Sequence, residues 1–163
     1  MGSEADSAGV VTPELVAALA RDVVAGASPG ELPLFRATSA AYMRDPQSVL
    51  EPRQGGEQSL GFGVEAAVLL ITPAALQAAR GVLEFLVSQI TEAAKSETSD
   101  QIRARVHRLF DRDVVAKPDA AALSPEQLAR VREIAFDAGI QAQLPEREAN
   151  LVADAMVGRL ALT

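Results

Sequence analysis

One glycine motif has the spacing of a phosphate-binding turn: Gly61-Phe62-Gly63-Val64-Glu65-Ala66 matches the G-x-G-x-x-A form of dinucleotide-binding proteins. In such a turn a buried strand ends at the first glycine, and the backbone then delivers the phosphates to a helix N-terminus. The residues before Gly61, from Gln54 to Ser59, are polar and rich in glycine, so they cannot form that strand. We therefore interpret the two glycines as a flexible connection that leads into a packed segment, and we expect no cofactor.

The other candidates for chemistry are a histidine and two carboxylates. His107 is the only histidine, and Asp111 and Asp113 have the spacing of an Asp-x-Asp metal motif. A Ser-His-Asp relay needs a nucleophile held on a sharp turn, and no Gly-x-Ser-x-Gly sequence occurs. A calcium loop needs further acidic ligands and a glycine, which are missing around Asp111. We therefore expect a solvated helix surface here, with no catalytic residue, no bound metal and no enzyme activity.

Three arginines have a spacing that could bind a partner. Arg105, Arg108 and Arg112 follow at i, i+3 and i+7, so a helix would place them along one stripe. Such a charged contact stripe suits an acidic partner or anionic lipid headgroups. It also suits the ordinary solvated face of a helix whose opposite face carries Val106. Both interpretations stay open.

Composition indicates an all-α protein. The chain has 163 residues, of which 48% are hydrophobic and only 4% aromatic. Its apolar content comes mainly from Ala, Leu and Val, whereas strands are enriched in aromatic and β-branched side chains. The net charge of -7 argues against a nucleic-acid partner. Cysteine is absent and the start, Met1 to Ser7, does not resemble a secretory signal, so we expect a cytoplasmic protein.

Three hydroxyl-proline pairs predict helix starts: Thr12-Pro13, Thr72-Pro73 and Ser124-Pro125. The hydroxyl can accept a bond from a backbone N–H of the first turn, and proline loses nothing at the first helical position. Gln127 completes a capping box with Ser124. Together with apolar periodicity, these signals predict helices over residues 13–25, 32–44, 73–95, 125–138 and 145–160. A new or continued helix is also predicted after Ser99, to about residue 112.

The predicted fold is a small bundle of five or six helices with a long central helix and a C-terminal helical hairpin. In the hairpin Gly139 is expected to end the first helix, and Leu151 is expected to face inward with Val152, Ala155, Met156 and Leu160. The predicted domains are a flexible segment at 1–11, a main helical domain at 12–112 with a loop at 46–60, a linker at 113–123, and the hairpin at 124–163, packed on the main domain.

The apolar tract from Leu60 to Ile90 raises the question of a membrane. Its uncharged part, Ala66 to Ala79, is shorter than the roughly 20 residues that a helical span needs. Extension toward Ile90 brings in Arg80 and Glu84, each of which costs about 3 kcal/mol near a bilayer centre. A constitutive span is therefore disfavoured. Continuous apolar character over 64–71 fits either a buried helix or a buried strand, because periodicity does not separate them.

These features favour a non-enzymatic helical interaction or assembly protein, an adaptor that binds another protein or a second copy of itself. The apolar face of the central helix is the hypothetical interface, formed by Leu76, Leu83, Leu86 and Ile90. The alternative is a membrane-active module or small effector, in which the tract from Leu60 to Ile90 docks on lipid or inserts into it while the arginine stripe meets the headgroups.

Overall fold

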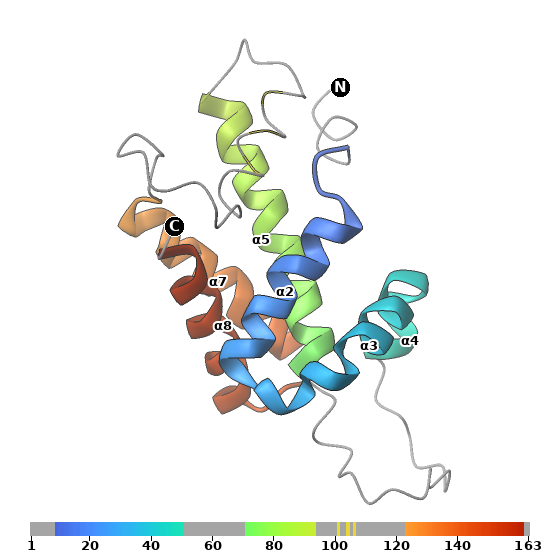
Figure 1. Cartoon of the computed structure of the whole chain (residues 1–163). Helices are drawn as coiled ribbons and strands as arrows, with labels where there is room; N and C mark the ends of the chain where they lie inside the picture. Colours follow the sequence, from blue (N-terminus) through green and yellow to red (C-terminus); the bar gives the residue numbers. More distant parts are fainter. Residues whose placement is uncertain are drawn as a thin grey trace, which may run out of the picture.

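The computed structural model describes residues 9–50, 71–93, 101, 104, 106 and 123–161. Over these residues the chain forms six α-helices and one short 3-10 helix, with no strand among them (Figure 1). The all-α class and the small helical bundle predicted from the sequence are confirmed.

The first helix, α2 (Pro13–Ala27), begins where the sequence predicts. The Thr12 hydroxyl accepts a hydrogen bond from the Leu15 N–H at 3.3 Å, and Pro13 occupies the first turn, where its missing donor has no cost. The helix ends two residues later than predicted. One face of α2 is apolar and buried, and it consists of Leu15, Val16, Leu19, Ala20, Val23 and Val24.

A 3-10 turn, η1 (Pro29–Glu31), connects α2 to α3 (Leu32–Arg44), whose bounds match the prediction. Phe35, Ser39 and Tyr42 form the buried side of α3. Their spacing of three and four residues places them on one face of the helix, so α3 is anchored to the bundle along a single narrow side.

The loop predicted over 46–60 is wrong at its start, because α4 (Pro46–Leu50) directly follows α3. Asp45 both ends α3 and begins α4. Its Oδ1 accepts a bond from the Ser48 N–H at 3.3 Å, and its backbone carbonyl accepts from the Ser48 hydroxyl at 3.0 Å. An aspartate before a proline is thus a helix start here as well as a stop. Residues 51–60 lie outside the described part of the chain.

The central helix, α5 (Ile71–Ala93), corrects the predicted start at Pro73. Thr72 lies inside the first turn and does not act as its cap. Its backbone N–H and its hydroxyl both donate to Oε2 of Glu31, at 2.9 Å and 2.6 Å. Pro73 is tolerated because the first N–H groups of a helix have no intrahelical acceptor. The uncertain stretch 64–70 lies outside the described residues.

The prediction that this helix is the most buried element agrees with the exposure of its side chains. Ten residues of α5 are at most 2% exposed: Thr72, Ala74, Ala75, Leu76, Ala78, Ala79, Val82, Leu83, Leu86 and Val87. Burial on so many sides requires cover from several helices. Helices α2, α3, α7 and α8 all contact α5.

The C-terminal hairpin consists of α7 (Pro125–Gln141) and α8 (Glu146–Ala161). The predicted capping box is present: the Gln127 N–H donates to the Ser124 hydroxyl at 3.2 Å, and the Ser124 N–H donates to the Gln127 Oε1 at 2.9 Å. The turn after α7 depends on Gln143, the only described residue other than glycine with a positive φ, at 63°.

Two predictions for the hairpin are wrong. Gly139 does not end α7 but lies inside it, where a Cβ would come within 2.8 Å of the Ala149 Cβ; the glycine serves close packing of α7 on α8. Leu151 does not face inward and is 42% exposed. The buried side of α8 follows Val152 and Met156, and Leu151 is rotated about 100° away from Val152.

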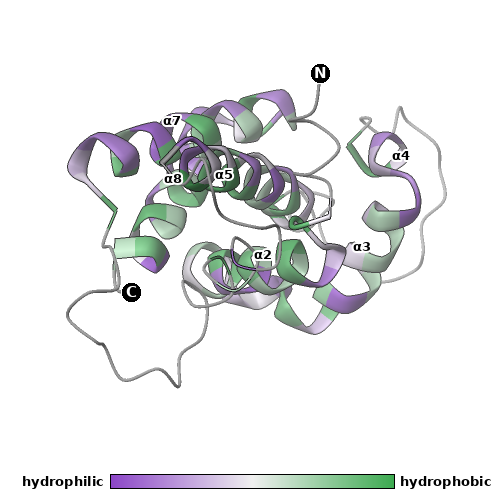
Figure 2. Ribbon diagram, turned by 90° about the horizontal axis from the view of Figure 1, so that it is seen from above, coloured by the Kyte–Doolittle hydropathy of each residue, from purple (hydrophilic) through white to green (hydrophobic). Residues whose placement is uncertain are grey.

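The helices are arranged around α5 (Figures 1 and 2). The α7–α8 hairpin lies on one side and contacts both α5 and α2, whereas α3 and α4 lie on the other side. An ion pair between Asp22 of α2 and Arg159 of α8, 2.6 Å apart, ties the hairpin to the N-terminal helix. Of the predicted linker 113–123, only Leu123 is described.

Candidate functional site

The residues predicted to form an apolar interface lie in the protein core. Leu76 and Leu83 are fully buried, Leu86 is 2% exposed, and Ile90 is half-buried against the same core. They are covered by the chain's own helices. A partner would reach them only after those helices had separated from α5.

The charged contact stripe of Arg105, Arg108 and Arg112 lies outside the described residues. The glycine motif at Gly61, His107, and the two aspartates Asp111 and Asp113 also lie outside them. Of the helix predicted around them, Gln101, Ala104 and Val106 are described and helical, and Val106 is buried. No described helix is both long and apolar enough to cross a bilayer. No described group of three or more His, Asp or Glu side chains is placed to hold a metal ion.

A different surface, the outward side of α3, combines residues that can bind. We call it the α3 face. All of its residues are exposed, and they are Pro33, Leu34, Arg36, Ala37, Ala40, Met43 and Arg44. The face contains two positive charges, no negative charge and five apolar residues. A solvated helix face usually carries mixed charges, so this composition is unusual for one that contacts only water.

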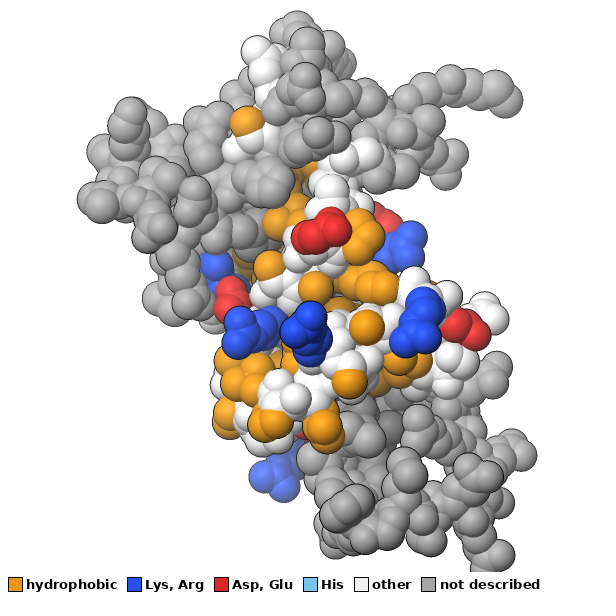
Figure 3. Space-filling model, turned by 45° about the vertical axis from the view of Figure 1, so that its right-hand side comes forward, with side chains coloured by type: hydrophobic (Ala, Val, Ile, Leu, Met, Phe, Trp, Pro, Cys, Tyr) orange, Lys and Arg blue, Asp and Glu red, His pale blue; other side chains and the backbone are white. Residues whose placement is uncertain are grey.

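The large apolar side chains of the α3 face are among the most exposed in the structure. Leu34 is 45% exposed and Met43 is 37% exposed. The other exposed large hydrophobic residues of the described part are Ile140 and Leu151 in the hairpin. Figure 3 shows the side of the molecule that includes α3, where arginine and apolar side chains lie beside one another.

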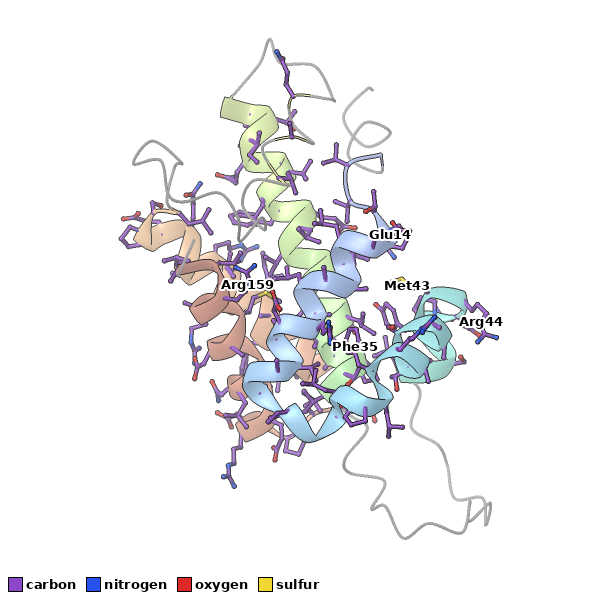
Figure 4. All side chains as sticks on the ribbon, viewed as in Figure 1. Glu14, Phe35, Met43, Arg44 and Arg159 are labelled. Atoms are coloured by element: carbon purple, nitrogen blue, oxygen red, sulfur yellow. The ribbon has the colours of Figure 1, made fainter. Side chains whose placement is uncertain are left out.

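The two arginines of the α3 face are free to bind. Neither Arg36 nor Arg44 has an ion pair or a side-chain hydrogen bond with any described residue, whereas Arg80, Arg130, Arg132 and Arg159 are all paired. Arg21 and Arg147 are also unpaired in the described part, but they lie on other helices. In Figure 4 the Arg44 side chain points away from the bundle, whereas Phe35 lies on the buried side of α3.

Three acidic residues around α3 have partners other than its arginines. Glu31, just before the helix, binds Thr72, and Asp45, just after it, caps α4. Glu84 of α5 pairs with Arg80 at 3.1 Å. Glu14 lies in the first turn of α2, where the helix dipole favours a negative charge. Within the described part of the chain no ion pair neutralises the guanidinium groups of Arg36 and Arg44, although the whole chain carries a charge of -7.

Chemically, the α3 face can bind but offers no group for bond-making steps. Guanidinium groups donate to carboxylates or phosphates in a fixed fork, and the apolar residues beside them gain from contact with another apolar surface. Tyr42, on the buried side of α3, is a further ionisable group. Its pKa is raised because burial disfavours the phenolate; Arg80 lowers that pKa and Glu84 raises it. Its hydroxyl is thus held in the neutral form.

The α3 face was missed by the sequence reasoning, although a signal for it exists. Leu32 to Arg44 is a run of 13 residues without an acidic side chain in a chain with 22 acidic residues. The three residues that the helix buries are two aromatic residues and a serine, which leaves Leu34 and Met43 outside. No protein-family model, curated protein or solved structure matches this chain.

Proposed function

We propose that this protein is a non-enzymatic helical interaction protein, an adaptor or assembly factor, and that its partner binds the α3 face. The observation that supports this most is the pair of unpaired arginines, Arg36 and Arg44, on a helix face that is otherwise apolar and exposed. Interfaces between proteins are enriched in arginine and methionine and depleted in acidic residues, which matches this composition.

The position of α3 supports the same function. The helix contacts α2, α4 and α5 and lies on the opposite side of α5 from the hairpin. A partner can therefore cover the outward side of α3 without displacing any core helix. This site replaces Leu76, Leu83 and Leu86, whose burial in the core makes them poor candidates for contact with another chain.

A cytoplasmic location belongs to this proposal. The absence of cysteine from the sequence supports it, because proteins of reducing compartments rarely depend on disulfides. Binding to lipid through the tract from Leu60 to Ile90 is a competing function. The part of that tract within α5 is largely buried, so the competing function would require α5 to leave the bundle.

Site-specific photo-crosslinking in the native cell tests the function. A benzophenone amino acid is placed at Ala37 or Ala40 of the α3 face, and at Ala129, an exposed alanine of α7, as the matched control. We expect one discrete protein adduct from the α3 positions that is absent from Ala129. Adducts to lipid, equal adducts from all three positions, or no adduct at all would each contradict the proposal.

A further inference from the structure

We infer that the partner of the α3 face is an acidic amphipathic helix, with two carboxylates about two turns apart that pair with Arg36 and Arg44. The inference rests on the proposed function and goes further, because it specifies the chemistry of the partner. It depends on three properties of the face: the spacing of the arginines, the small residues between them, and the charge around them.

The spacing of the arginines sets the spacing of the partner's carboxylates. Arg36 and Arg44 are eight residues apart, which corresponds to about 12 Å along a helix axis. Ala40 lies midway between them on the same i, i+4, i+8 row. Such rows form the ridges along which helices pack. A second helix that runs along this row, with carboxylates at positions i and i+7 or i+8, would place one carboxylate within reach of each guanidinium group.

The small residues of the α3 face favour a helix over a bilayer. Ala37 and Ala40 lie at the middle of the exposed side, so another backbone can approach closely there, while Leu34 and Met43 contact the partner at the edges. Alanine gains little on transfer to lipid. Each arginine near an anionic membrane contributes about 1 kcal/mol, and two of them fall short of the four to eight basic residues of membrane-binding clusters.

Charge distinguishes an acidic partner from a second copy bound through the same face. A symmetric contact of α3 with α3 would bring four arginines together without a carboxylate, because the face has none. An acidic helix instead neutralises both charges. Among the described acids, Glu31, Asp45 and Glu84 have partners other than Arg36 and Arg44, so these three do not compete with an acidic partner.

The experiment continues from the Ala40 crosslink. The crosslinked segment of the partner is identified by mass spectrometry, synthesised as a peptide, and titrated against the full-length protein by fluorescence anisotropy. We expect a segment with helical apolar periodicity and two Asp or Glu residues seven or eight positions apart. The double variant Arg36→Glu with Arg44→Glu should bind it at least about tenfold more weakly. Replacing the two carboxylates of the peptide by lysine should restore binding to that variant.

The controls separate this inference from the proposed function. Arg147→Glu reverses an unpaired exposed arginine on α8 and should leave the affinity unchanged, and circular dichroism verifies that both variants keep the helical fold. A crosslinked segment without the two carboxylates, or failure of the lysine peptide to rescue, overturns the acidic-helix inference and leaves the α3 face as an interface. Capture of a second copy of this chain through its own α3 would also overturn the inference. Absence of any α3 adduct overturns both proposals.

Discussion

The carboxylate of Glu31 caps a helix that begins forty residues later, through two hydrogen bonds from Thr72: one from its backbone N–H at 2.9 Å and one from its hydroxyl at 2.6 Å. Glu31 is only 2% exposed. The first N–H groups of a helix have no partner within the helix, and a negative group there is favoured by the helix dipole. A side chain from η1 thus supplies what a local cap supplies for α2 and α7.

Replacing Glu31 by alanine should destabilise the fold by about 1–3 kcal/mol, because two buried donors of Thr72 lose their acceptor. Glu31→Gln keeps one acceptor oxygen and should cost less. Urea unfolding followed by circular dichroism measures both. As a control, Asp137→Ala removes an exposed carboxylate of α7 and should change stability by less than about 0.5 kcal/mol. Equal stability of Glu31→Ala and the parent would show that the two bonds contribute nothing.

The glycines of the hairpin allow a paired test of close packing. In Gly139→Ala the new Cβ would lie 2.8 Å from the Ala149 Cβ and 3.0 Å from its Cα, so α7 and α8 must move apart. We expect a loss of about 1–3 kcal/mol, because overpacking outweighs the gain in helix propensity. Gly158→Ala meets no atom within 4 Å and should stabilise α8 by about 0.5–1 kcal/mol. Thermal unfolding of both variants should move the melting temperature in opposite directions.

A charge at the centre of α5 should abolish the fold. Leu83 is fully buried, so Leu83→Asp leaves an unpaired carboxylate in the core. We expect loss of cooperative unfolding, or aggregation. Leu151→Asp makes the same change at a side chain that is 42% exposed and should keep the parent's unfolding curve. Should the Leu83 variant unfold like the parent, α5 would not be the core and its apolar face would again be a candidate interface.

The raised pKa of Tyr42 predicts that the folded protein loses stability at alkaline pH. Burial raises its pKa above the ordinary value of 10.0, with Glu84 adding to the rise and Arg80 opposing it. In the unfolded chain the phenol therefore loses its proton first as the pH rises. Its contribution to stability is complete below pH 10 and is lost as the pH passes through the pKa of the folded state.

The chain itself offers the measurement, because Tyr42 is its only tyrosine and there is no tryptophan. Tyrosinate absorbance should titrate with a higher midpoint in the native protein than in concentrated urea. The free energy of unfolding of Tyr42→Phe should fall less steeply above pH 10 than that of the parent. Coincident midpoints in the native and unfolded protein would contradict a raised pKa of Tyr42 in the folded state.

Local signals in the sequence were sufficient for the helices that begin at Thr12 and Ser124. In each, a hydroxyl residue, a proline and the following turn specify the cap within four residues, and the structure has the same bonds. The same pattern at Thr72 predicted the wrong start for α5, because the N-terminus of this helix is capped by Glu31, which is distant in the sequence. A pattern of neighbours cannot reveal a bond whose acceptor is positioned by tertiary packing.

The interface was harder to predict for a related reason. The strong apolar periodicity of Leu76, Leu83 and Leu86 is shared by core helices and by binding helices, and only the positions of the other helices decide between them. The α3 face has weaker periodicity but a distinctive charge pattern. Gly139 shows the same limit on a smaller scale, since a glycine near a helix end fits a stop as well as a close contact with Ala149.

The order of the helices along the chain has a consequence for synthesis. The central helix α5 is made before α7 and α8, which cover one of its sides; there a Cβ on Gly81 would lie 3.1 Å from Ile134. In a nascent chain that has emerged only as far as α5, the side of this apolar helix that α7 and α8 later bury is therefore still uncovered. Exposed apolar surface of this kind makes a partly folded chain prone to aggregation. Final burial of α5 waits for the C-terminal hairpin.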